Sequence, residues 1–251
     1  MNQTIYQRLL PSCLAISALV TPPAKALTEA QVLERLSGVP VFTITDDKGA
    51  PLLGSAKKGG DEQILLFFLN PNDAQTMLKQ VQTANPDVGK KARVIVRSMN
   101  DAYKVIRENK DKKIAFQIVP SQTSLDSART LLTAGGKPPA QLPNVPIFFA
   151  VSGNGPQDGL LTIEQQGKQF VPFFFEQNDL KSMIDNATKG QPNIAQTAKI
   201  QVTNLFQVLD SMVSTEKNKP SSEVEKFTFI PSRAAYEWII KNQTPASSPK
   251  K

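Results

Sequence analysis

Two stretches of the chain share one pattern of apolar and polar positions at a separation of 106 residues. "VPVFTIT" (39–45) and "VPIFFAV" (145–151) are rich in β-branched and aromatic residues, and a segment with turn residues follows each of them. Such runs are typical of buried β-strands. At the same separation, "FFLNPND" (67–73) is matched by "FFFEQND" (173–179), in which an apolar strand leads into Asn and Asp side chains that favour a helix start.

The parallel continues through the rest of the chain. The helical patterns of 74–81 and 180–187, and the short apolar runs of 92–96 and 198–202, keep the separation of 106 residues. Two further amphipathic patterns predict helices at 98–110 and 204–217. "FQIVPS" (116–121) and "FTFIPS" (227–232) then match at a separation of 111 and each leads into a last helix.

We predict from this order two copies of a unit of about one hundred residues, at about 38–135 and 144–241, related by a pseudo-twofold axis. The alternative is ordinary recurrence of strand and helix composition. The elements predict an α/β or α+β fold with a mixed β-sheet covered by helices, in which the two copies share one sheet or one extensive interface. Before the copies, 27–38 predicts a leading helix with Thr28 and Gln31 spaced as a capping box, and 243–251 is a polar tail.

The N-terminus has the order of a cleavable secretory signal. Arg8 precedes an apolar run over 9–20, and the small residues Ala24 and Ala26 flank Lys25. We expect a signal peptide at 1–26 and an exported single domain at 27–251; the alternative is an uncleaved anchor. The only cysteine, Cys13, lies inside this segment, and no later segment is long and apolar enough to span a membrane.

Composition narrows the classes of function. The 251 residues are 40% apolar, as in a globular protein, and carry a net charge of +7. The lysines are scattered and do not alternate with aromatic residues, so we expect a solvated surface and no nucleic-acid binding. The chain has no histidine and no nucleophile or phosphate-loop motif, so we predict no catalytic residue, cofactor or metal. The more prominent acids are expected at turns and helix starts: Asp46, Asp47, Asp73 and Asp179.

Phenylalanine gathers beside the predicted strands. Eight of the 13 phenylalanines lie there, some of them consecutive, and neighbours along a strand point to opposite faces. Either the sheet is covered on both faces, or part of one face is an open apolar groove. We take as candidate peptide-binding residues one pair from each copy: Phe42, Phe68, Phe148 and Phe174.

The ordered blocks resemble one family. "LSGVPVFTIT", "ILLFFLNPNDAQTML", "ARVIVRSMNDAYKVI", "NVPIFFAV" and "FVPFFFEQNDLKSMI" are similar to those of the Tic twenty-two (Tic22) family, soluble proteins of the chloroplast intermembrane space with cyanobacterial and apicoplast relatives. The resemblance covers about 27–241 and implies a pseudo-twofold α/β body with apolar pockets.

The resemblance also implies a non-enzymatic role. The expected function is that of a chaperone or import factor that binds unfolded precursor or outer-membrane polypeptides and assists transport and outer-membrane biogenesis. The secretory-type leader indicates the periplasm, the counterpart of the intermembrane space of chloroplasts. The alternative is a docking or scaffold protein for an Omp-eighty-five type insertase that holds no client.

Overall fold

The structure is a computed structural model, and its strands are gathered into two sheets. It describes residues 14–15, 27–55, 63–109, 114–136, 138, 141–153, 159–190, 197–213 and 222–242. The chain divides into two compact units. We call Leu36–Ser121 with Pro231–Lys251 the smaller unit, and Met1–Arg35 with Gln122–Ile230 the larger unit. The predicted signal peptide and polar tail lie outside the described residues, apart from Leu14–Ala15.

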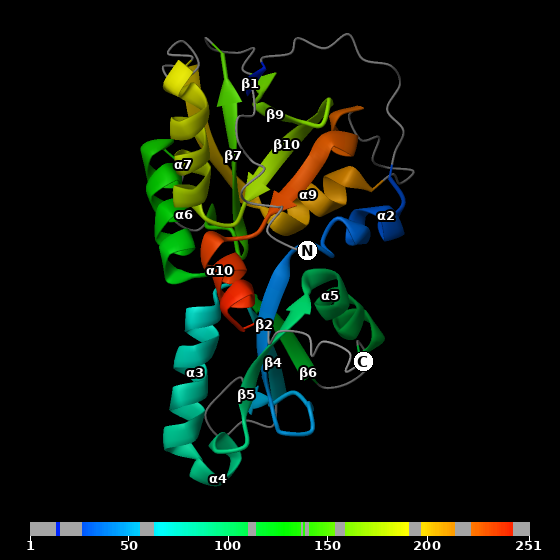
Figure 1. The fold of residues 1–251 in the computed structure, drawn as a ribbon, viewed down its shortest axis with the longest axis vertical. Helices are drawn as coiled ribbons and strands as arrows, with labels where there is room; N and C mark the ends of the chain where they lie inside the picture. The colour runs from blue at the N-terminus through cyan, green and yellow to red at the C-terminus, as the bar shows by residue number, and fades with distance from the viewer. Residues whose placement is uncertain are drawn as a thin grey trace, which may run out of the picture. The chain divides into compact units, whose positions relative to one another are not determined.

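The smaller unit is built on a five-stranded mixed sheet (Figure 1). Its strands run in the order β3-β4-β2-β5, with β6 parallel to β4. Helix α3 packs on β2 and β4, and α5 packs on β2 and β5. The bounds of its elements are β2 Pro40–Thr45, β3 Gly54–Ser55, β4 Gln63–Phe68, α3 Pro71–Ala84, α4 Pro86–Gly89, β5 Arg93–Ser98, α5 Met99–Glu108, β6 Ile114–Val119 and α10 Arg233–Asn242.

The larger unit is built on a seven-stranded sheet in the order β1-β9-β10-β7-β11, with β12 parallel to β10 and β8 paired with β7. Helices α6 and α7 lie against one face of this sheet, next to each other in Figure 1. The bounds of its elements are β1 Leu14–Ala15, α2 Glu29–Glu34, α6 Gln122–Ala134, β7 Pro146–Ser152, β8 Gly159–Leu160, β9 Thr162–Gln165, β10 Lys168–Phe174, α7 Gln177–Ala187, β11 Ala198–Asn204, α9 Leu205–Met212 and β12 Phe227–Ile230.

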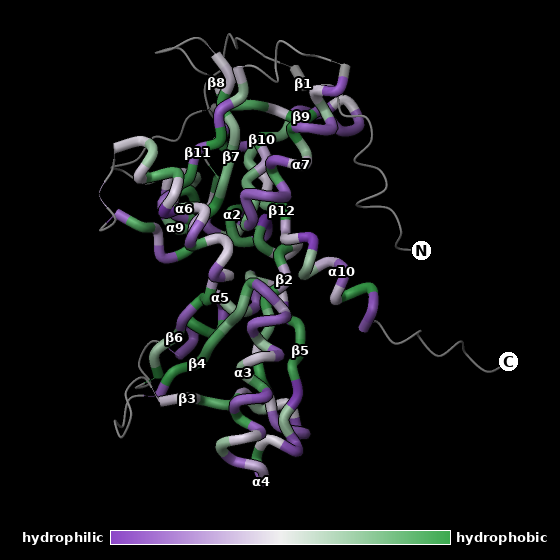
Figure 2. Tube along the Cα trace, turned by 90° about the vertical axis from the view of Figure 1, so that its left-hand side faces the viewer, coloured by the Kyte–Doolittle hydropathy of each residue, from purple (hydrophilic) through white to green (hydrophobic). Residues whose placement is uncertain are grey.

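Local sequence explains where these elements begin. Asn70 caps α3 by accepting a hydrogen bond from the Asn72 amide, with Pro71 at the first helical position. The predicted capping box is confirmed, because Thr28 and Gln31 each accept a hydrogen bond from the other's backbone N–H at the start of α2. Figure 2 shows hydrophobic colour along the central strands and alternating colour along the helices, which place one apolar side on a sheet.

Strand pairing repeats between the units at the predicted separations. Phe42 pairs with Phe68 in the smaller unit, and Phe148 pairs with Phe174 in the larger unit. Likewise, β5 pairs with β2 as β11 pairs with β7, and β6 runs parallel to β4 as β12 does to β10. The mixed α/β fold is therefore as predicted. A common origin of the units and a pseudo-twofold axis stay predictions.

Two expectations about domain organisation differ from the structure. The described strands form two sheets, so the alternative of one shared sheet is wrong. The units also differ from the predicted copies, because each copy's last helix belongs to the other unit. Helix α6 follows β6 of the smaller unit but puts Ala128 in the core of the larger unit. Helix α10 follows β12 of the larger unit but puts Ala235 in the core of the smaller one.

Candidate functional site

The four candidate phenylalanines lie in two closed cores. Phe42 and Phe148 are 0% exposed, Phe68 is 4% exposed and Phe174 is 6% exposed. Helices α3 and α10 cover the first pair, and α6 and α7 cover the second. The prediction that these four residues line an open groove is therefore wrong for the folded structure, because helices cover the apolar strand faces on which they lie.

The opposite face of the larger sheet is also covered. Phe149 and Phe173 point away from the Phe148 face, and Phe173 packs against Phe227 and Phe229 with ring centroids 4.9 and 5.9 Å apart. Phe173, Phe227 and Phe229 are 3%, 8% and 5% exposed. Consecutive phenylalanines thus serve two cores on opposite faces of the sheet, and burial on both sides is the alternative that the structure supports.

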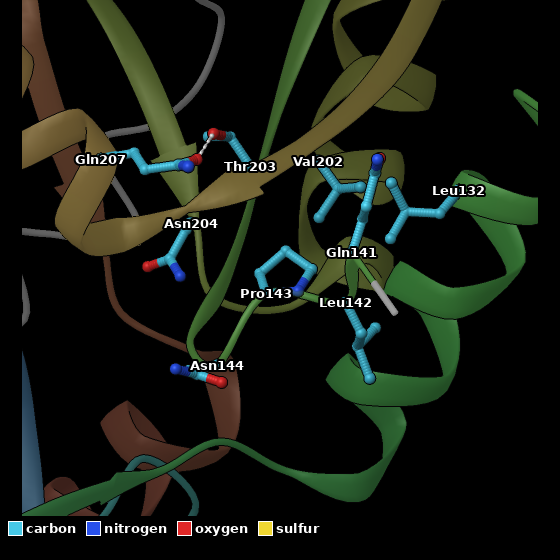
Figure 3. A pocket seen from close by; sticks show the side chains of 9 residues that line it. All are labelled: Leu132, Gln141, Leu142, Pro143, Asn144, Val202, Thr203, Asn204 and Gln207. Carbon is cyan, nitrogen blue, oxygen red and sulfur yellow. Dashed lines mark hydrogen bonds between the residues drawn. The ribbon is translucent and has the colours of Figure 1, made fainter. Parts of the chain in front are cut away.

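A hollow of about 460 Å³ opens at the end of β11 in the larger unit (Figure 3). One part of its lining is the segment before β7, another is the junction of β11 with α9, and α6 adds one side chain. Its lining residues are Leu132, Gln141, Leu142, Pro143, Asn144, Val202, Thr203, Asn204 and Gln207.

Uncharged amide and hydroxyl groups dominate this lining. Thr203 Oγ1 donates a hydrogen bond to Gln207 Oε1 at 3.4 Å. Asn204 Oδ1 accepts from the Phe206 amide at 3.0 Å and so caps α9. Among the described residues that line the hollow, none has a charged side chain. At the positions that correspond to Thr203 and Gln207, the smaller unit has Arg97 and Asp101. The hollow therefore suits a neutral ligand with many hydrogen-bonding groups, such as a polypeptide backbone.

Strand β11 brings a free sheet edge to this hollow. It is the last strand of its sheet, and no other described strand pairs with its outer side. The amide of Leu205 donates to the Val145 carbonyl, so alternate residues from Leu205 backwards bond to β7. Val202, which lies between two of them, directs its N–H and C=O to the outer edge. In the sequence, Phe206 follows Leu205 and lies between Asn204 and Gln207, two residues that line the hollow, and it is 37% exposed.

The titratable groups with a shifted pKa lie elsewhere. Burial raises the pKa of Asp73, which stands in the first turn of α3 as predicted. Burial lowers the pKa of Arg35, and Glu225 opposes this shift. The Arg35 guanidinium donates to the Phe227 and Glu225 carbonyls at 2.6 and 2.8 Å, which fixes the start of β12.

Two further acids lie at the structural positions that the sequence predicts. Asp179 lies in the first turn of α7. Asp46 Oδ1 accepts hydrogen bonds from the backbone N–H groups of Lys48 and Ala50 in the turn after β2.

Sequence reasoning did not find the hollow. Apart from Leu132 of α6, its residues come from two segments about sixty positions apart, and each of these segments by itself is an ordinary turn or helix start. Only the Asn204 cap could be read from the sequence. In the described part of the chain, His, Cys, Asp and Glu form no group of three suited to a metal ion, and none of the helices has the length and apolar character needed to cross a membrane.

Comparison with known proteins gives consistent matches. Residues 11–241 match the model of the Tic22-like family. The chain is 25% identical to Protein TIC 22-like, chloroplastic, of Arabidopsis thaliana over 82% of this chain and 62% of that protein, and so spans less than two thirds of it. It is 26% identical to Protein TIC 22, chloroplastic, of the same plant, over 85% of this chain and 72% of that protein.

Two solved structures share the fold. The Tic22 of Anabaena, described as a protein of protein transport, matches with a TM-score of 0.71 and 22% identity over 88% of this chain and 100% of that chain. Tic22 from Plasmodium falciparum matches with a TM-score of 0.64 and 26% identity over 84% of this chain and 96% of that chain.

Proposed function

The chain belongs to the Tic22-like family, and we propose that it is a non-enzymatic protein-transport factor that binds unfolded precursor or outer-membrane polypeptides. We place it in the periplasm, after export by the signal peptide at 1–26, where it assists outer-membrane biogenesis. The family match and the description of the Anabaena structure support the transport role. The two plant relatives are named chloroplastic, and the secretory-type order of the N-terminus supports the periplasm for this chain.

One observation carries the binding proposal: the hollow lined by uncharged amide and hydroxyl groups meets the free edge of β11. A polypeptide in extended conformation bonds to a sheet edge through its backbone, and such bonds are the same for every client sequence. Amide side chains beside the edge can bond to the client's remaining backbone groups. This arrangement suits a factor that must accept many unfolded clients.

The test removes the backbone N–H of Val202, which points outward from the sheet edge. Val202→Pro removes the N–H that points away from β7, and proline is tolerated on edge strands where that group faces solvent. Val202→Ala keeps the amide and loses the side chain that packs on the core. Val96→Pro makes the same change at the corresponding position of β5. Val96 pairs with Phe42 as Val202 pairs with Phe148. The three variants separate edge bonding from packing and from a general effect of proline.

Binding is measured by anisotropy of a labelled outer-membrane β-barrel polypeptide diluted from urea, with suppression of its aggregation as the second readout. We expect Val202→Pro to weaken binding by about 2- to 12-fold, the equivalent of one net hydrogen bond. Val96→Pro should bind as the unmodified protein does, and Val202→Ala, which keeps the outward N–H, should lose less affinity than Val202→Pro. If folded Val202→Pro also binds unchanged, the edge is not the site. If the unmodified protein ignores the polypeptide, a docking or scaffold role on an Omp-eighty-five type insertase replaces the proposal.

A further inference from the structure

Helix α10 covers an apolar surface in the smaller unit. Its Ala235 is buried against a core that contains Phe42, Phe68 and Ala74. The Trp238 ring meets Phe42 edge to face, with centroids 5.0 Å apart. We call the surface beneath α10, formed by Phe42, Phe68, Ala74, Leu66 and Met77, the α10 seat.

The helix places little of itself in the core. Ala235 is the only buried residue among its ten, Trp238 is half-buried, and Ile240 is 54% exposed. A helix that buries so few side chains contributes few of the contacts that resist local opening. The apolar side chain of Ile240 therefore remains largely in water even while α10 covers the core.

Helix α6, the corresponding helix of the larger unit, is fixed more firmly. It buries three residues: Ser124, Ala128 and Leu132. Ser124 Oγ also donates a buried hydrogen bond to the Phe175 carbonyl at 2.9 Å. At the separation of 111 residues, Ala235 takes the place of Ser124 and has no hydroxyl to make this bond. Of the two exchanged helices, α10 therefore buries fewer side chains and lacks the hydroxyl anchor that α6 has at this position.

We propose that α10 is a releasable cover, and that the α10 seat is a second polypeptide-binding site that accepts an amphipathic helical segment of a client. The seat already holds such a helix, with a small residue and an aromatic residue three positions apart, so α10 itself defines the chemistry of the ligand. The proposal rests on the proposed function only in taking polypeptides as clients. It gives Phe42 and Phe68 a binding role only after α10 has left.

The ligand must compete with a tethered helix. A minor open state is typically populated at about 0.1–10%, and the apparent affinity of a ligand that binds only this state is reduced to the same fraction of its intrinsic affinity. A client segment that binds only the α10 seat therefore binds weakly. If another part of the same client also binds at β11, the two weak interactions together raise the overall affinity.

Trp238 is the only tryptophan of the chain and so reports the position of α10. The probe is a capped peptide with the sequence of α10 and Phe in place of Trp, RAAYEFIIKN, added up to about 1 mM because a tethered competitor acts at millimolar effective concentration. We expect the Trp238 emission to shift to longer wavelength, with stronger quenching by acrylamide, as the peptide replaces α10.

Two variants with the same added charge provide the control. Ala235→Glu puts a carboxylate into the buried contact and should release α10, which shifts the emission without peptide and tightens peptide binding by about tenfold or more. Ile240→Glu adds that charge on the exposed side and should behave as the unmodified protein does. Hydrogen exchange of the unmodified protein, which needs no variant, should be at least about tenfold faster in α10 than in α6.

An unchanged Trp238 emission at the highest peptide concentration, or equal protection of α10 and α6, would overturn the proposal. The outcome is separable from that for β11. If the peptide has no effect while Val202→Pro still weakens client binding, the cover is refuted and the proposed site at β11 stands. If the peptide displaces α10 while Val202→Pro has no effect on client binding, the seat stands and the β11 site is refuted.

Discussion

Substitution of Phe148 tests whether the paired phenylalanines form a core or a binding surface. Phe148 is 0% exposed and lies in the core closed by α6 and α7, with Ala128, Phe174, Leu180 and Ile184 in the same cluster. A buried Phe removes about 150–250 Å² from water, which at about 25 cal/mol/Å² gives about 4–6 kcal/mol as an upper bound. We expect Phe148→Ala to lower the free energy of unfolding by about 3–5 kcal/mol, the usual range for such truncations.

The assay is unfolding by urea, followed by far-ultraviolet circular dichroism and by Trp238 fluorescence. Circular dichroism reports both units, whereas Trp238 lies in the smaller unit, so coincidence of the two curves checks for a two-state transition. Phe149→Ala is the matched control, because Phe149 is only half-buried and faces the other side of the sheet. It should cost roughly half as much or less.

Two results together would show that Phe148 does not lie in a closed core. If Phe148→Ala unfolds within about 1 kcal/mol of the unmodified protein, the side chain does not fill a closed core. If that variant also loses binding of an unfolded outer-membrane polypeptide, Phe148 belongs to a surface groove. A large loss of stability, with binding retained wherever the variant is folded, supports the core.

Two further substitutions follow from single contacts. Ser124→Ala leaves the buried Phe175 carbonyl without the hydroxyl and should lower the free energy of unfolding by about 1–3 kcal/mol in urea titrations, and an unchanged midpoint and slope would contradict this. Burial raises the pKa of Asp73, so the energetic penalty of its charged form is absent below the ordinary pKa and fully present above the raised one. Asp73→Asn should therefore gain stability relative to the unmodified protein as the pH rises from 3 to 7, and a difference independent of pH would show that burial does not control this carboxylate.

The exchange of helices explains why unit boundaries could not be read along the chain. Pro120-Ser121 and Pro231-Ser232 end a strand and open a helix in the same way, and the local signals do not state which sheet the helix will cover. Amphipathic faces of α6 and α10 fit any apolar sheet surface of suitable size. Tertiary packing decides which of the two cores each helix joins.

The candidate site shows the same division. Asn204 at the start of α9 could be predicted, because a strand followed by Asn and an apolar helical pattern is a capping signal. The hollow could not, because Gln141 and Asn144 meet β11 only through the pairing of β7 with β11. A free edge also has no pattern of its own, since an edge strand and a central strand share the same alternation.

Local sequence is enough to predict the main strands and most helix starts, because these depend on side-chain periodicity and on capping residues a few positions apart. The constant separation of 106 residues matched Phe42 with Phe148 and Phe68 with Phe174, whereas the pairing of Phe42 with Phe68 and of Phe148 with Phe174 is seen only in the sheets. That helices bury both pairs follows from tertiary packing alone. An apolar strand face has the same sequence whether a helix, a client or water lies on it, and the helices that cover it here come from distant parts of the chain.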